Sequence, residues 1–322
     1  MGYVVYGGEL SYFTRKLEAA LIFYGVDFEL SAKNRDNRAV IESRSGTHQV
    51  PVLQTPENWM IGDTTPLLSL LDARYPARRM FPEGALGVLV HIIEEYFDEW
   101  IARTMVHYRW HYPASAEFAS LRMAGGDAEA AARVRDWGPR ACRATGTDST
   151  QQREAAELEY QRLLEAMERQ LGETRYLLGD RPTAVDCVVL GGLRAHTNMD
   201  PDPKQLTAGY PGVIAWSEGT ADSWEGTGEL AGMPDSTEFA QFIVREMQTS
   251  YLPYILANQA AQAVGAKACH ADIYGEQVSF LSRPYPERSR AMISERIRNQ
   301  LSDYERDQVG AWLKANGLDE CF

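Results

Sequence analysis

Apolar and polar positions along the first 75 residues follow two different periods. Short runs rich in β-branched and aromatic residues predict strands, whereas apolar side chains at helical spacing, such as Leu17, Leu21 and Tyr24, predict helices. Strands are expected at residues 3–6, 26–30, 50–54 and 58–61, and helices at residues 11–24, 36–44 and 64–75. This order, βαβ followed by ββα, predicts an α/β N-terminal domain.

Helical patterns dominate the rest of the chain after residues 76–82, which have the composition of a linker. Gly275-Glu276 lies between two β-rich flanks and predicts a hairpin at residues 271–281. Residues 1–78 and 86–322 are therefore expected to form an α/β domain and a larger, all-helical C-terminal domain with one small hairpin. The helices are expected at residues 86–112, 150–171, 182–196, 211–224, 236–264 and about 286–316.

Length and composition are those of a globular protein. The chain has 322 residues, 44% of them hydrophobic, which is enough for a sizeable core and agrees with two domains. No segment reaches the roughly 20 consecutive apolar residues of a membrane span, and the first residues lack the basic lead of a secretion signal. A cytoplasmic location is expected. The four cysteines are far apart and are expected to be reduced thiols: Cys142, Cys187, Cys269 and Cys321.

The net charge of −13 argues against a nucleic-acid backbone or an anionic membrane as the main partner, because clustered Lys and Arg hold those. Residues 1–82 carry nine basic and nine acidic side chains, so the acidic excess lies in the remaining chain. The N-terminal part is therefore neutral and able to accept an anion.

Two short motifs in this neutral part are the most informative. Val50-Pro51 precedes a short apolar strand, and a proline at the start of a strand is a usual place for a cis peptide bond. Asp63-Thr64 precedes an apolar run at helical spacing and predicts a helix N-terminus. Free amides, a hydroxyl and the positive end of a helix dipole can bind a small anion such as a carboxylate.

These motifs and the order of elements resemble the glutathione transferases, which join a thioredoxin-like N-terminal domain to an all-helical C-terminal domain. The resemblance covers residues 3 to about 216 and also rests on Gly179-Asp180-Arg181-Pro182-Thr183-Ala184-Val185-Asp186. In this stretch Thr183 and Asp186 are spaced as a capping box at a buried helix start. The resemblance implies glutathione as co-substrate, a hydrophobic electrophile as second substrate, a homodimer, and detoxification chemistry.

The resemblance also assigns the residues that bind glutathione. Val50, before Pro51, pairs through its backbone with the cysteinyl part of the tripeptide, and Asp63 and Thr64 hold the γ-glutamyl end. The loop that approaches Pro51 is longer than usual in the family. Gln49 is the first candidate to meet the glycyl carboxylate, and His48 is the second.

Ser11 matches, by spacing alone, the catalytic position of the serine- and cysteine-type members. A hydroxyl that donates to sulfur, aided by amides at a helix end, favours the reactive thiolate. Tyr12 and then Tyr6 are the alternative donors, and Ser11 also fits a plain role as helix N-cap. Because Ser11 and Thr14 stand where redox relatives carry Cys-x-x-Cys, dithiol chemistry is not expected.

An aromatic stripe in the first long helix has two interpretations. In the family the corresponding helix borders the co-substrate cavity, yet such a stripe is more often plain core. Two of its histidines are one turn apart, but no third ligand accompanies them, so no metal is expected. The candidates are Tyr96, Trp100, His107, Tyr108 and His111.

The sequence thus predicts an enzyme that activates the glutathione thiol for conjugation, ether or halide displacement, or isomerisation. The alternative is a non-catalytic binding or scaffold protein with the same fold. Residues 233–322 extend beyond the resemblance, as a lid over the cleft or as part of a subunit interface.

Overall fold

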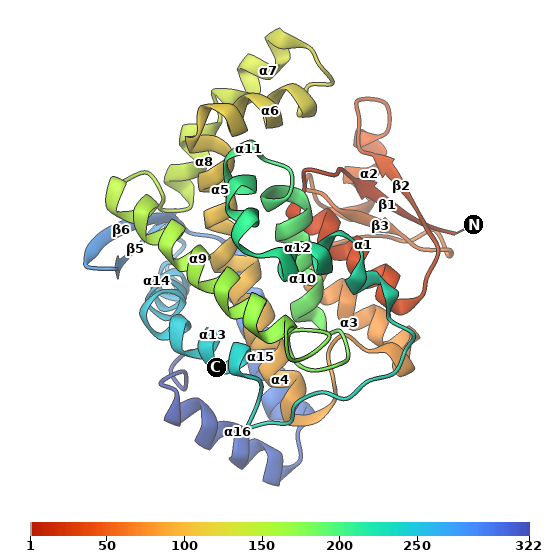
Figure 1. Cartoon of the computed structure of the whole chain (residues 1–322), viewed down its shortest axis with the longest axis vertical. Coiled ribbons are helices and arrows are strands. Elements are labelled where there is room, and N and C mark those ends of the chain that lie inside the picture. Colours follow the sequence, from red (N-terminus) through yellow and green to blue (C-terminus); the bar gives the residue numbers. More distant parts are fainter. Residues whose placement is uncertain (1) are drawn as a thin grey trace.

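The computed structural model describes residues 2–322. The first part of the chain folds into β1 (Tyr3–Gly7), α1 (Tyr12–Tyr24), β2 (Phe28–Ala32), α2 (Arg38–Ser45), β3 (Val52–Gln54), β4 (Met60–Gly62) and α3 (Thr64–Arg74). The strands form one sheet in the order β2-β1-β3-β4, with β1 and β2 parallel and the other neighbours antiparallel. This is the expected thioredoxin-like arrangement, drawn in red and orange in Figure 1.

The loop before β3 carries a cis peptide bond between Val50 and Pro51, so this prediction is confirmed. Proline has no N–H to donate, and the ladder therefore begins only at Val52, which pairs with Gly62 of β4 and Tyr6 of β1. The expected strand at residues 50–54 is two residues too long for this reason.

A helical part follows the linker and runs from α6 and α7 at the top of Figure 1 through the middle of the molecule to α4 lower down. Its elements are η1 (Pro76–Arg78), α4 (Gly84–Glu95), η2 (Tyr96–Ile101), α5 (Ala102–His111), α6 (Pro113–Met123), α7 (Ala128–Arg135), α8 (Gly138–Ala144), α9 (Thr150–Leu171), α10 (Ala184–Gly192), η3 (Leu193–Thr197), α11 (Pro201–Lys204), η4 (Gln205–Gly209), α12 (Pro211–Glu218) and η5 (Thr220–Ser223). The helix expected at residues 86–112 contains the π-helical segment η2, which a regular period does not reveal.

The C-terminal extension comprises α13 (Glu238–Thr249), α14 (Tyr251–Ala263), β5 (Ala268–Ile273), β6 (Glu276–Leu281), α15 (Pro284–Gln300) and α16 (Asp303–Ala315). Two single helices were expected where the structure has pairs, and both expectations are wrong. The chain leaves helical geometry at Ser250, and Ser302 with Glu305 forms a capping box that starts α16 as a new helix. The hairpin turn is Tyr274-Gly275, both at positive φ, and not Gly275-Glu276.

The sheet part and the helical part meet where α10 packs on α1. Gly191 allows this approach, because a Cβ there would lie 2.7 Å from the backbone oxygen of Tyr12. Asp186 fixes the start of α10, since its carboxylate accepts the N–H groups of Thr183 at 2.7 Å and Leu177 at 2.9 Å. The predicted capping box is confirmed.

The extension wraps around the helical part. Helices α15 and α16 pack against α4, and β5 packs against α14. Figure 1 shows the hairpin of β5 and β6 on the opposite side of the view from the four-stranded sheet. None of the helices in the described part of the chain combines the length and the apolar character that a bilayer-spanning segment needs.

Candidate functional site

A cavity of about 290 Å³ opens beside the cis peptide bond. Five stretches of chain surround it: the start of α1, the loop before β3, the start of α3, segment η2, and the connection from β6 to α15. We call it the cis-proline cavity. Its lining residues are Phe13, Thr47, Gln49, Val50, Pro51, Asp63, Thr64, Asp98, Glu99, Leu281, Ser282, Arg283, Pro284 and Tyr285. Five of the six residues expected to bind glutathione are thus brought together.

Asp63 and Thr64 form the end of the cavity at the start of α3. Asp63 has φ of 68°, an uncommon conformation for a non-glycine residue that occurs often at functional sites. Its side chain makes no capping bond, so the first amides of α3 are not satisfied by it. Burial and the neighbouring Asp98 raise the pKa of Asp63 above its usual value. The cavity therefore combines a carboxylate with a helix N-terminus, which together suit an ammonium and a carboxylate on one ligand.

The opposite end of the cavity is more exposed. Gln49 lines it, whereas His48 does not and is exposed. The ammonium of Lys33 lies behind both residues, donating 2.6 Å to the carbonyl oxygen of His48 and pairing with Glu42 at 3.0 Å. This end can bind an acceptor group through the Gln49 amide.

The three hydroxyls considered as thiol donors have different partners, and none of them lines the cavity. The hydroxyl of Tyr12 is buried and donates to the carbonyl oxygen of Phe97 at 3.2 Å, and that of Tyr6 donates to Gln54 at 3.0 Å. Ser11 accepts the N–H of Thr14 at 3.2 Å as the N-cap of α1. No hydrogen bond within residues 2–322 uses the Ser11 hydroxyl as donor. Of the three hydroxyls, that of Ser11 is therefore the one that can still donate to a ligand.

A second cavity of about 140 Å³ adjoins the first. It is mainly apolar and takes its walls from α1, η2, α5, α8, α14, β6 and the connection after β6. We call it the inner cavity. Its lining residues are Phe13, Asp98, Glu99, Trp100, Ala102, Arg103, Val106, Ala144, Thr145, Tyr254, Phe280 and Arg283. Four of these, Phe13, Asp98, Glu99 and Arg283, line both cavities and mark their junction.

An ion pair spans this junction. The guanidinium of Arg283 lies 2.6 Å from the carboxylate of Glu99 and donates to the hydroxyl of Tyr254 at 3.1 Å. Burial raises the pKa of Glu99 to about 7; Arg283 opposes this rise, and Asp98 and Asp63 add to it. The extension thus contributes a cation to the cavity.

A buried charge cluster lies behind the junction. Lys16 of α1, whose side chain is 0% exposed, pairs with Glu94 and with Asp98 at 2.7 Å. The hydroxyl of Thr65 in α3 also donates to Glu94, at 2.8 Å. This cluster joins the sheet part to α4 and η2, and so fixes the position of Asp98 and its neighbour Glu99.

The aromatic stripe is largely core. Of its five candidates only Trp100 lines the inner cavity, while Tyr96 is fully buried and shares the acceptor Glu159 with the Trp100 ring nitrogen. His107 bonds to Glu157 at 2.6 Å. Neither Tyr108 nor the exposed His111 lines either cavity. Within residues 2–322 no group of three or more His, Cys, Asp or Glu side chains is arranged to hold a metal ion.

Sequence reasoning missed the charged residues of the junction. Asp98 and Glu99, like Glu94 and Glu95 before them, are carboxylates within a largely apolar helical stretch, which is an available signal because buried carboxylates are rare without a reason. Arg283 has no such signal, since its partner Glu99 is 184 residues away in the chain.

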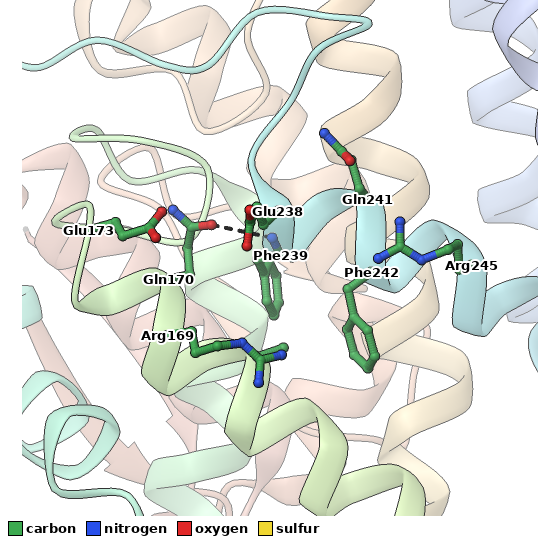
Figure 2. A pocket seen from close by; sticks show the side chains of 9 residues that line it. Arg169, Gln170, Glu173, Glu238, Phe239, Gln241, Phe242 and Arg245 are labelled. Atoms are coloured by element: carbon green, nitrogen blue, oxygen red, sulfur yellow. Dashed lines mark hydrogen bonds between the residues drawn. The ribbon is translucent and has the colours of Figure 1, made fainter.

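Another hollow, between α9 and α13, contains none of the predicted residues. Figure 2 shows Arg169, Glu173, Glu238 and Arg245 around it, with the Gln170 amide accepting the N–H of Phe239 at 3.3 Å. Charges of both signs mix there on the surface, so it has no feature of the expected site.

Comparison with protein families identifies the class of protein. A model of the glutathione S-transferase N-terminal domain matches residues 5–79, and one of the C-terminal domain matches residues 150–219. The chain belongs to the glutathione S-transferase family. No curated protein matches it.

Several solved structures are similar to this chain. A glutathione S-transferase from Rhodospirillum rubrum F11 is 16% identical, with 75% of this chain and 99% of that one covered and a TM-score of 0.46. A glutathione S-transferase from Methylobacterium radiotolerans, in complex with glutathione sulfonate, is 20% identical. The match covers 70% of this chain and 92% of that one, with a TM-score of 0.44. The beta-etherase LigF from Sphingobium is 13% identical. The match covers 70% of this chain and 97% of that one, with a TM-score of 0.48. Similarity this low does not transfer a ligand or an activity.

Proposed function

We propose that this protein is a glutathione transferase that binds the tripeptide in the cis-proline cavity. The observation that carries the proposal is the convergence, in one cavity, of the cis Val50–Pro51 bond, Asp63 and Thr64. The γ-glutamyl ammonium pairs with Asp63 and its carboxylate meets Thr64 and the first amides of α3. The cysteinyl backbone pairs with Val50, and the glycyl carboxylate meets Gln49.

The work is divided between two domains. Residues 1–78 bind glutathione, and residues 86–322 form the helical domain that supplies the co-substrate site. The inner cavity accepts a hydrophobic electrophile against Phe13, Trp100 and Phe280. A thiolate in the cis-proline cavity then faces the electrophile across the junction, ready for conjugation, ether or halide displacement, or isomerisation.

Ser11 is the proposed thiol donor. Its hydroxyl is the one of the three candidates that keeps its proton within the described residues, and it lies at the positive end of α1. A hydrogen bond from this hydroxyl favours the thiolate over the thiol. This role of Ser11 assigns the protein to the serine-type subgroup.

The test combines glutathione titration by calorimetry with turnover of a chlorodinitrobenzene. The wild type is expected to bind and to turn over. Ser11→Ala should bind glutathione normally and lose about 10²-fold in rate, as with comparable oxyanion donors. Ser11→Thr, which keeps the hydroxyl, serves as the matched control. An unchanged rate in Ser11→Ala would move the role to another group.

A scaffold protein without catalysis is the second candidate. Two observations favour it: Ser11 does not line the cavity, and three carboxylates line it against one cation, Arg283. Binding of glutathione with no turnover of any electrophile would support this reading. We also propose a cytoplasmic location in either case, since the four cysteines are free and buried. A homodimer is proposed from the family resemblance alone, and sedimentation of the purified protein tests it.

A further inference from the structure

We propose that Glu99 accepts the proton of the glutathione thiol and that Arg283 then stabilises the thiolate. This inference rests on the proposed function and assigns its proton transfer to two residues that are not among the predicted site residues. It also gives the C-terminal extension a part in the chemistry, because Arg283 lies between β6 and α15.

The position of the pair carries the argument. A sulfur bound in the cis-proline cavity has to meet an electrophile in the inner cavity, and the reaction therefore takes place where the two cavities join. Three ionisable residues line both cavities, and they are Asp98, Glu99 and Arg283. Asp98 is occupied by Lys16 at 2.7 Å, so the Glu99–Arg283 pair is the one available to a ligand.

Both members of the pair are held in place yet reachable. The backbone of Arg283 is fixed by Asn258 of α14, whose amide group accepts its N–H and donates to its carbonyl oxygen, each at 2.9 Å. The Arg283 side chain is 34% exposed and that of Glu99 8%. The guanidinium can therefore bond a new partner without movement of the main chain.

Charge balance explains why a pair is needed. The cis-proline cavity is lined by Asp63, Asp98 and Glu99 against the single cation Arg283, and a thiolate added to these carboxylates is repelled. When the thiol proton moves to Glu99, one negative charge disappears from the carboxylate as one appears on sulfur. The net charge of the cavity is unchanged, and Arg283 exchanges one anionic partner for the other.

The step balances as follows. The S–H bond of glutathione breaks, its electron pair stays on sulfur, and the proton forms an O–H bond on Glu99. The thiolate attacks the carbon of an aryl halide, the carbon–halogen bond breaks, and halide leaves with its electron pair. Glu99 returns its proton to solvent through the cavity mouth. With an ether as co-substrate, the proton goes to the leaving oxygen instead.

Neighbouring groups set the pH range of this step. Around Glu99, the carboxylates of Asp98 on η2 and Asp63 before α3 favour its protonated form. Burial and Glu99 in turn raise the pKa of Glu95 on α4 well above its usual value. Arg283 from the extension and Lys16 from α1 oppose Asp98 and Asp63, and Tyr254 on α14 bonds to Arg283. The resulting pKa of about 7 makes Glu99 a competent base at neutral pH.

The experiment follows the rate with a chlorodinitrobenzene as a function of pH. In the wild type the rate should rise through about pH 7, the pKa of Glu99. Glu99→Gln should lose about 10²-fold at pH 6.5, because no base then takes the thiol proton, and the rise of the rate through about pH 7 should disappear. Glu295→Gln, an exposed acid on α15 outside both cavities, is the control.

The ultraviolet absorbance of bound thiolate supplies an independent measurement. Arg283→Gln should shift the midpoint of thiolate formation upward by about one pH unit or more, and Arg283→Lys should restore part of the shift. If the wild type neither binds glutathione nor turns over, the proposed function fails. If it does both while Glu99→Gln keeps the wild-type rate and pH profile, only the present inference is overturned. Circular dichroism checks that each variant is folded.

Discussion

Replacement of Lys16 by methionine is the sharpest test of how the two parts of the molecule are held together. Lys16 lies on α1 with its side chain 0% exposed, and its ammonium bonds Glu94 and Asp98 of the helical part and Thr65 of α3. Lys16→Met keeps an unbranched apolar side chain as far as Cε and removes the charged ammonium. Two buried carboxylates then remain without their cation.

The magnitude follows from burial. Removal of one partner from a buried ion pair typically costs about 3–5 kcal/mol, because the remaining charge is left uncompensated. The unfolding entropy is roughly 2.1 cal/mol/K per residue, which for 322 residues converts this loss into a decrease in Tm of roughly 4–7 °C. Urea unfolding and thermal circular dichroism measure the two quantities.

Arg15→Met is the matched control, one position earlier on the same helix. Arg15 pairs with Glu18 at 2.7 Å, but its side chain is 26% exposed, and such partly exposed pairs are worth about 1 kcal/mol or less. A small effect for Arg15→Met beside a large one for Lys16→Met would assign the loss to the buried cluster and not to α1 itself.

The stability deficit of Lys16→Met should also depend on pH. Burial raises the pKa of Glu94 to about 7 even with Lys16 present, and without the cation it rises further. The native state then keeps a proton that the unfolded chain releases, so stability falls as pH rises from about 5 to 8. The deficit of Lys16→Met should be largest near pH 8 and small near pH 5. A variant as stable as the wild type at pH 8 would refute this reasoning.

Three further predictions concern single residues. Gly191→Ala places a Cβ 2.7 Å from the backbone oxygen of Tyr12 and should cost about 1–3 kcal/mol of unfolding free energy; no loss in urea unfolding would contradict the close α1–α10 contact. Thr64→Ala should weaken glutathione binding about 10-fold or more, because a hydrogen bond to a charged ligand group is lost; calorimetry checks this, and an unchanged Kd would exclude the hydroxyl from binding. Burial and Asp98 raise the pKa of Asp63, so affinity for glutathione should fall with decreasing pH already above the usual aspartate range. Asp63→Asn should bind weakly without that pH dependence, and equal slopes for both proteins would contradict the ammonium contact.

The parts of the molecule that the sequence predicted well depend on neighbouring residues alone. Pro51 at a strand start, Asp63-Thr64 before an apolar run, and the Thr183–Asp186 capping box each act within a few residues. Ser302-x-x-Glu305 is a signal of the same kind at the break between α15 and α16. It was present in the sequence and shows that the last helix is interrupted.

The remaining features depend on contacts between distant segments. Tyr96 belongs to the core and not to a cavity, and its hydroxyl donates a hydrogen bond to Glu159 of α9 at 2.8 Å. The spacing of apolar residues within its own helix does not predict this contact with α9. The junction of the two cavities likewise depends on Arg283 reaching Glu99 across the fold. Helical spacing specifies a face, but the element that packs on this face decides what it does.

A crystal structure of the protein soaked with glutathione tests the central claim most directly. The account predicts the tripeptide along the backbone of Val50, with its γ-glutamyl end at Asp63 and Thr64 and its sulfur directed to the junction with Glu99 and Arg283. Crystals without a ligand at saturating glutathione, or a tripeptide bound outside the cis-proline cavity, would contradict it.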